Sequence, residues 1–299
     1  MGVSPGGTID GLVYHGGLQL ASGHPGFGGL SGLSFASDTR LVMVTDEGHF
    51  VSGDLMLDEG RPAALDNVEI DAILNSSGQP LPRKFARDSE SIDVVFRNGR
   101  PDAVRVGFEN LTRVAEFSLV DGRPEGPATE IAIPDWLSRL RTNETIESLC
   151  MAPPASPVAG STLLITEGHS LEPGSWAATL LGVRDRGDLH LAQQGRVNPT
   201  DCAFLANGDL LVVERSFMFL TFTVQIRLIP AEEVRPGAMM TGEVILRASG
   251  GDVDNFEGIA TRILPDGSER ITIVSDDNFL GLQRTLLLEF SLPQDEADR

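Results

Sequence analysis

Short apolar runs alternate with turn segments along nearly the whole chain. In residues 255–279, one apolar run opens near Glu257, breaks at an Asp-Gly turn and resumes until Asp276 and Asp277. An Asp-Gly pair between two β-type runs is a strong hairpin signal. In an antiparallel hairpin, the start of the first strand and the end of the second lie at the same edge. We therefore expect acids from both strands to lie side by side.

The same pattern occurs five times at nearly constant spacing. The first runs begin at Ser31, Glu90, Glu147, Asp201 and Glu257, which are 59, 57, 54 and 56 residues apart. The second runs end at Glu47, Glu109, Glu167, Glu214 and Asp277. A turn segment lies near the midpoint of each pair. Each unit is therefore predicted to be a hairpin with an acid at both open ends.

Further strand-like runs lie between the hairpins, for example at 114–122, 177–183 and 222–229. Each period thus holds about four short strands. Helical periodicity is nearly absent, and only 134–142 and 231–235 are expected to form single helical turns. Four strands in each period of this length are typical of the blade of a β-propeller.

The predicted fold class is all-β, with one β-propeller domain over residues 1–299. After the last hairpin one strand remains, at 285–292, and the N-terminal part supplies another around 9–20. These two strands can complete one blade and close the ring. We favour five blades of four antiparallel strands, with six as the alternative if an irregular blade lies within 51–86.

The formal net charge of −20 argues against nucleic acid and anionic membrane surfaces, which need basic patches. It is compatible with cation binding and equally with solubility alone. No apolar run is long enough to span a bilayer, and no signal peptide is visible. We expect a monomer that takes a small-molecule substrate or ligand. Its compartment is left open: periplasmic or secreted if a leader was trimmed, otherwise cytoplasmic.

The two cysteines fit neither a disulfide-rich framework nor a metal motif. Cys150 and Cys202 lie three and one positions after matching acids, which gives them the same strand-face parity in neighbouring blades. Side chains of equal parity face different interfaces between blades. The prediction is that both remain buried free thiols.

In a propeller the first strand of each hairpin would line the central channel, so the repeated acids converge at one mouth. One layer holds Glu90, Glu147, Asp201 and Glu257, with Ser31 in place of the fifth acid. The second layer is formed by the acids at the ends of the second runs, and Asp46 and Asp276 add to it.

Nine carboxylates around one mouth must take up protons, pair with basic groups or hold a cation. A hard cation such as Ca²⁺ or Mg²⁺ is the expected occupant, because all the ligands would be oxygens. The predicted metal ligands are Glu47, Glu90, Glu109, Glu147, Glu167, Asp201, Glu257, Asp276 and Asp277. The alternative is that each acid only binds backbone amides of the neighbouring unit and fixes how blades dock.

Other residues are candidates for catalysis and substrate binding at the mouth. His49 and His169 follow matching Glu-Gly pairs and are candidates for acid–base work. Glu214 and Arg215 are further catalytic candidates. Arg87 and Arg215 are candidates for binding the substrate.

Several segments resemble one known family, most specifically LLVVERSF (211–218) and NFEGIA with VSDDNF (255–260 and 274–279). They are similar to the phytase-like, or esterase-like, propeller proteins found mostly in bacteria, over residues 29–279. The resemblance implies a β-propeller that hydrolyses phosphoesters or other esters. The well-known propeller phytases bind several calcium ions and use a basic patch for phosphates, whereas this chain has only 23 Lys and Arg. A lactonase-type mechanism with one Ca²⁺ in the channel fits that low basicity better.

Two functions follow from this pattern. The first is a metal-dependent hydrolase, in which the metal polarises an ester or phosphoryl oxygen and activates water while a carboxylate or His acts as base. The second is a non-enzymatic propeller that binds a ligand or partner, with the acids and any metal tying the blades together. Both require that Glu147 and Glu167 lie at the same end of one blade.

Overall fold

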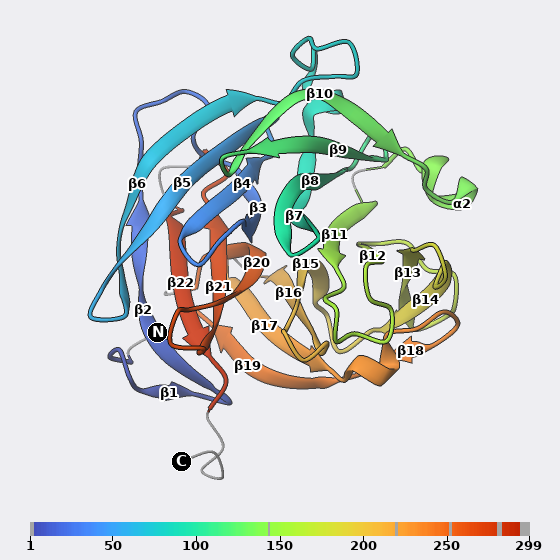
Figure 1. Ribbon diagram of the computed structural model, residues 1–299. Coiled ribbons are helices and arrows are strands. Elements are labelled where there is room, and N and C mark those ends of the chain that lie inside the picture. Colours follow the sequence, from blue (N-terminus) through green and yellow to red (C-terminus); the bar gives the residue numbers. More distant parts are fainter. Residues whose placement is uncertain (1–2, 143, 219–220, 251–252, 280–282, 294–299) are drawn as a thin grey trace.

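The computed structural model describes residues 3–142, 144–218, 221–250, 253–279 and 283–293. Five antiparallel sheets surround a central axis (Figure 1), which confirms the five-bladed β-propeller. Helices are few and short, namely α1 (Lys84–Arg87), α2 (Asp135–Ser138) and the single 3-10 turn η1 (Ala231–Glu233). No helix among the described residues is long and apolar enough to cross a membrane.

The blades follow one another along the chain. Blade 1 is β3 (Leu30–Phe35), β4 (Arg40–Thr45), β5 (His49–Asp58) and β6 (Arg61–Ala72). Blade 2 is β7 (Ser89–Arg97), β8 (Arg100–Phe108), β9 (Arg113–Val120) and β10 (Arg123–Ile131). Blade 3 is β11 (Ile146–Met151), β12 (Thr162–Thr166), β13 (Ser175–Leu181) and β14 (Gly187–Ala192), extended by the parallel strand β18 (Met239–Met240). Blade 4 is β15 (Asn198–Phe204), β16 (Leu210–Met218), β17 (Thr221–Ile229) and β19 (Glu243–Ser249).

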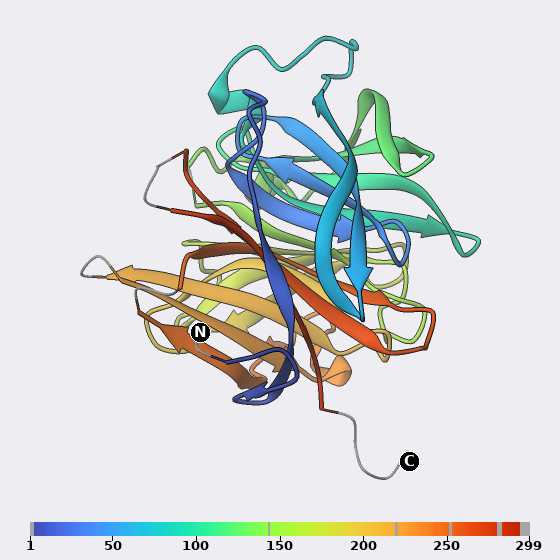
Figure 2. The same cartoon turned by 90° about the vertical axis from the view of Figure 1, so that its left-hand side faces the viewer.

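Blade 5 closes the ring with both ends of the chain. Its inner strands are β20 (Asn255–Ile263), β21 (Glu269–Asp276) and β22 (Thr285–Ser291), and its outer strands are β2 (Leu12–Leu20) and β1 (Thr8–Ile9). Figure 2 shows β2 (dark blue) running along β22 (dark red) at this seam. The predicted closure is confirmed. The segment 51–86, which was the place for a sixth blade, instead supplies most of β5, β6 and α1.

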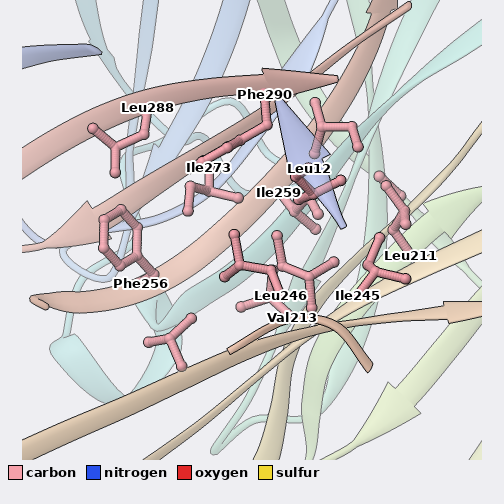
Figure 3. Packing of buried hydrophobic residues seen from close by; sticks show 14 of the residues in the cluster. Leu12, Leu211, Val213, Ile245, Leu246, Phe256, Ile259, Ile273, Leu288 and Phe290 are labelled. Carbon is pink, nitrogen blue, oxygen red and sulfur yellow. The ribbon is translucent and has the colours of Figure 1, made fainter. Parts of the chain in front are cut away.

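The first strand of every hairpin is the innermost one. The strands β3, β7, β11, β15 and β20 contact one another in order around the axis. Among the described residues, one apolar cluster fills each of the five interfaces between neighbouring blades. The cluster between blades 4 and 5 includes Leu211 and Val213 of β16 and Phe256 and Ile259 of β20 (Figure 3). Each strand has a neighbouring blade on both of its faces. These clusters therefore explain why apolar residues occupy both faces of the strands.

A β-bulge lies near the start of each innermost strand. In blade 3, Ile146 pairs with Thr166 and Ser148 pairs with Ile165, so Glu147 is the extra residue. The extra residues of the five blades are Ser31, Glu90, Glu147, Thr200 and Glu257. A bulge bends the strand and redirects the side chain of the extra residue. In blade 4 this residue is Thr200, so the expected alignment of Asp201 with the repeated glutamates is off by one position.

The prediction of two free thiols is wrong, because Cys150 and Cys202 form a disulfide between β11 and β15. Counted from the bulges, Cys150 is three positions after Glu147, and Cys202 is two positions after Thr200. Their strand-face parity is therefore opposite, and both side chains enter the apolar cluster between blades 3 and 4. The expectation failed because it counted from Asp201.

We predict that reduction destabilises the propeller. The disulfide joins residues 52 positions apart, and in the chain-entropy account such a loop constrains the unfolded chain by about 4 kcal/mol. Denaturation with and without reductant, and of a Cys150→Ser/Cys202→Ser variant, measures this difference. Denatured, unreduced protein should contain no free thiol. A titration that finds two would contradict the disulfide.

Candidate active site at the acidic mouth

The ends of the second strands meet the five bulges at one mouth of the channel. The residues before the bulges pair with Thr45, Phe108, Thr166, Glu214 and Ser275. The next residues along the chain are Asp46, Glu109, Glu167, Arg215 and Asp276. The prediction that Glu147 and Glu167 share one end of blade 3 is confirmed. The edge of the mouth therefore carries four acids and one arginine, whereas sequence reasoning expected five acids.

Burial and mutual repulsion raise the pKa values of these acids. Burial is the larger cause for Glu90 and Glu147, whose pKa values lie well above the usual range, and the surrounding carboxylates add to it. The same two causes raise the pKa of Glu109 and of Asp276 to about 8. Burial also raises the pKa of Glu257, although Arg215 opposes this. With pKa values of about 8, Glu109 and Asp276 hold protons at neutral pH unless a cation replaces them.

Basic side chains neutralise one part of the mouth. In blade 1, Lys84 Nζ lies 3.1 Å from Asp46 Oδ2 and 3.3 Å from Glu47 Oε1. Arg87 reaches Glu47 at 3.3 Å. Across the mouth, Arg215 Nη2 lies 2.9 Å from Glu257 Oε1. Asp46, Glu47 and Glu257 thus have counter-charges, whereas Asp276 forms no ion pair among the described residues.

The acids of blades 2 and 3 do not have such partners. Asp88, Glu90 and Glu109 each place an oxygen within 4.8 Å of the other two. Glu109 is 8% exposed, and its hydrogen-bonding neighbours Asp88 and Glu147 are themselves carboxyls. Its Oε2 has no donor among the described residues. No Lys or Arg in the described chain forms an ion pair with this cluster.

This oxygen cluster fits a hard divalent cation. Three carboxylates converge, and one of them has a buried oxygen without a donor among the described residues. Burial first, and then the neighbouring carboxylates, raise the pKa values of all three, although Lys84 opposes this for Asp88. Ca²⁺ and Mg²⁺ prefer such all-oxygen donor sets. Asn110, which donates to Asp88 through Nδ2, adds an amide oxygen close by.

Asp88 was missed by sequence reasoning. It lies two residues before the bulge at Glu90, where the other blades carry Gly29, Thr145, Asn198 and Asn255. Aligning the blades on their bulges would have exposed this position as one with a polar side chain in four of the five units. No residue type in the sequence identifies the bulge, so the blades can be aligned on their bulges only with the structure.

Two predicted ligands dock strands instead of facing the other acids. The Asp201 carboxylate accepts hydrogen bonds from the backbone N–H of Cys202 and, across the blade interface, of Ile259. Asp277 accepts from the N–H groups of Gly29 and Phe279 and from the Thr285 hydroxyl. These contacts match the amide-docking alternative for these acids.

The structure does not bring Glu214 and the two histidines together with the cluster. Glu214 is completely buried and forms an ion pair with Arg227. The ring of His49 packs against Gly26, and burial lowers its pKa, helped by Arg87. The ring of His169 stacks on Trp136, with their centroids 5.3 Å apart.

A family model described as phytase-like, "Esterase-like activity of phytase", matches residues 25–279. The chain belongs to the phytase-like family. No curated protein sequence matches this chain. Among solved structures, one titled "glucose dehydrogenase" is 11% identical, with 88% of this chain and 96% of that chain covered and a TM-score of 0.44. Another, "YCF48 bound to D1 peptide", is 10% identical, with 97% and 99% covered and a TM-score of 0.39.

We predict that the stability of this phytase-like protein falls with rising pH when cations are chelated. The folded pKa values of Glu109 and Asp276, about 8, exceed their ordinary values of 4.5 and 3.8. The folded state therefore binds more protons, and this stabilisation, complete at low pH, is lost between about pH 4 and pH 8.

Urea denaturation from pH 5 to pH 8 with chelator present measures this loss. Glu109→Gln should lower the slope, because Gln keeps the shape of the side chain but does not titrate. Glu59→Gln, an exposed acid in the β5–β6 turn, is the control. An unchanged slope in Glu109→Gln would show that Glu109 titrates normally.

Proposed function

We propose that this phytase-like propeller is a metal-dependent hydrolase of esters, lactones or phosphoesters, acting at the acidic mouth. The observation that carries the proposal is the cluster of Asp88, Glu90 and Glu109, whose charges are not balanced within the described chain. The family description, which names an esterase-like activity, supports the same reaction class.

Asp88, Glu90 and Glu109 would hold the metal, with Ca²⁺ preferred and Mg²⁺ as the alternative. When bound, such an ion supplies a Lewis acid for the ester or phosphoryl oxygen and lowers the pKa of water. The three carboxylates would have to lose their protons on binding, so the affinity for the cation should increase with pH.

Glu147 is the proton acceptor that we favour. Burial and the surrounding carboxylates raise its pKa, so it would accept a proton only when a cation at the neighbouring cluster favours its ionised form. It is 8% exposed, lies outside the three-oxygen cluster and is hydrogen-bonded to Glu109. A base must be within reach of the reacting water, and this neighbour of the cluster is better placed than His49 or His169. Glu167 lies beside it, and Asn198 Nδ2 fixes the orientation of that carboxylate at 2.6 Å.

Arg215 is the candidate for binding the developing negative charge on the substrate. It occupies the edge position that carries an acid in the other four blades, and the carboxylates around it raise its pKa although burial opposes this. Its Nη2 is engaged by Glu257, whereas its Nε has no partner among the described residues. A guanidinium suits carboxylate and phosphate oxygens. Arg87, held by Glu47, is a second candidate.

Exposed apolar side chains surround the mouth. They lie in α1 before blade 2, in the connections that follow β8, β12 and β21, and at the end of β16: Phe85 (50% exposed), Leu111 (38%), Leu171 (39%), Phe279 (50%) and Phe217 (53%). Leu111 and Phe217 each lie two residues after a residue of the mouth edge. Such a rim supports a substrate with an apolar acyl or aryl group beside the scissile bond.

The non-enzymatic alternative also has support. Lys84 bridges the linker before blade 2 to Asp46 of blade 1, and Arg215 bridges blade 4 to Glu257 of blade 5. These ion pairs show that charges at the mouth connect blades. A cation bound by Asp88, Glu90 and Glu109 of blade 2, next to Glu147 of blade 3, would then have a purely structural role.

We predict that calcium stabilises chelator-treated protein more than sodium does at equal ionic strength. A cation that binds only the native state adds about 2.7 kcal/mol at a hundredfold excess over Kd, which is about 5 °C in melting temperature for a domain of this size. Asp88→Asn and Glu109→Gln should remove the calcium-specific part of the shift. Asp58→Asn and Glu59→Gln, which lie at the other end of blade 1, should not. Equal shifts for both salts would instead indicate general screening of the net charge.

We predict calcium-dependent hydrolysis of p-nitrophenyl esters that Glu147→Gln reduces by at least about 100-fold, the scale of general-base catalysis. Phe217→Ser should raise KM for long acyl chains more than for acetate, because it removes apolar contact area. Phe96→Ser, equally exposed at the end of β7 away from the mouth, is the matched control. If calcium binds at Asp88 and Glu109 but no ester, lactone or phosphoester is turned over, the non-enzymatic function is favoured.

A further inference from the structure

A second group of charged side chains lies at the opposite end of blade 5. Arg262 near the end of β20 pairs in register with Arg270 near the start of β21, and both are at least nine-tenths buried. The neighbouring part of β22 contributes Ser291, and β2 contributes His15. This is the seam where the two ends of the chain complete the ring.

Arg262 is balanced within the fold. It forms a buried ion pair with Glu289, donates to the backbone carbonyl of Asp38 in blade 1, and lies over the ring of Phe35 at 4.6 Å. Glu289 thus neutralises one of the two guanidinium groups. Burial, together with the nearby Arg270 charge, lowers the pKa of Arg262.

Arg270 forms no comparable ion pair in the described chain, although its charge, after the hydrogen bonds from Ser268, helps to lower the pKa of the exposed Asp266. It is 9% exposed, and no carboxylate of the described residues lies within ion-pair distance of it. Its Nη1 lies 2.5 Å from His15 Nε2, and its Nε has no partner among the described residues. Burial and the Arg270 charge lower the pKa of His15 to about 4, so the imidazole is neutral and can accept the hydrogen bond from Arg270. A buried charge without a counter-charge is strongly unfavourable.

The surroundings of Arg270 suit an incoming anion. Ser291 Oγ lies 2.9 Å from His15 Nε2, and both residues are partly exposed, so the group can be reached from solvent. His15 is the extra residue of a bulge between Tyr14 and Gly16, which redirects its ring. Because a guanidinium can only donate, Arg270 Nη1 donates to His15 Nε2, so the imidazole, as the acceptor, orients Arg270. The remaining N–H groups of the guanidinium and the Ser291 hydroxyl are the donors for an oxygen anion.

We propose that Arg270, His15 and Ser291 form a binding site for an oxyanion, a carboxylate or phosphate group, at the seam that closes the propeller. The anion neutralises Arg270 and joins β21 to both β2 and β22, and so locks the N-terminal strand into blade 5. The site is separate from the acidic mouth and independent of the function proposed there.

Two different oxyanions with this chemistry could occupy the site. One is a free anion such as inorganic phosphate. The other is a carboxylate of this chain, because the sequence after Ser291 includes Asp295, Glu296 and Asp298. A chain that ends at Pro293 distinguishes the two.

The test measures melting temperature and calorimetric binding with inorganic phosphate against chloride at matched ionic strength, with chelator present. Phosphate should raise the melting temperature of wild type, and Arg270→Met should abolish the shift and weaken binding by about tenfold or more. Arg139→Met, an exposed arginine on α2's flank, is the control and should respond as wild type does. If Arg270→Met does not fold, His15→Gln and Ser291→Ala should each weaken phosphate binding while retaining the fold.

If a carboxylate of the chain is the occupant, full-length protein responds weakly to phosphate and the chain ending at Pro293 responds strongly. In that case Arg270→Met removes the strong response of the shortened chain. The proposal is overturned if Arg270→Met responds to phosphate as wild type does at both chain lengths, or if neither length binds phosphate.

Discussion

The β-bulge at the start of each innermost strand is the constraint on which the site depends. A regular strand would turn alternate side chains into the two flanking blade interfaces, where apolar clusters exclude charge. The bulge frees one residue per blade from this alternation, and in three blades that residue is a glutamate: Glu90, Glu147 and Glu257. Since the innermost strands pack around one axis, these carboxylates converge where neither interface can accept them. Their raised pKa values are the electrostatic consequence.

Apolar packing between blades and the Cys150–Cys202 disulfide hold the ring closed against this repulsion. Basic side chains relieve only part of this repulsion, because Lys84 and Arg87 pair with acids of blade 1 and Arg215 pairs with Glu257 of blade 5. The opposite end of the molecule has the reverse imbalance at Arg270. Both ends thus hold buried ionisable groups that form no ion pair within the described chain, which is energetically costly.

The sequence was sufficient to predict the five blades, the innermost strands and the closure by both chain ends, because hairpin signals recur along the chain at a nearly constant spacing. It was not sufficient to fix which acids face the mouth. A bulge adds one residue without a sequence signature, and a shift of one residue exchanges the two faces of a strand. Thr200 was therefore overlooked in favour of Asp201, Asp88 was missed, and the parity of Cys150 and Cys202 was misjudged. All three errors have the same cause: the sequence does not reveal how the first two strands of each blade pair at the bulge.

The register also explains how a fivefold repeat forms a one-sided site. At the edge of the mouth, the second strands present Asp46, Glu109, Glu167 and Asp276, and then Arg215 in place of a fifth acid. That single exchange balances Glu257, and the linker carrying Lys84 balances Asp46. Asp276 and the mouth acids of blades 2 and 3 form no ion pair in the described chain, and they lie near the guanidinium of Arg215 in blade 4. A cation and an anionic oxygen can therefore occupy adjacent positions at one mouth, which a symmetric ring of ten acids would not allow.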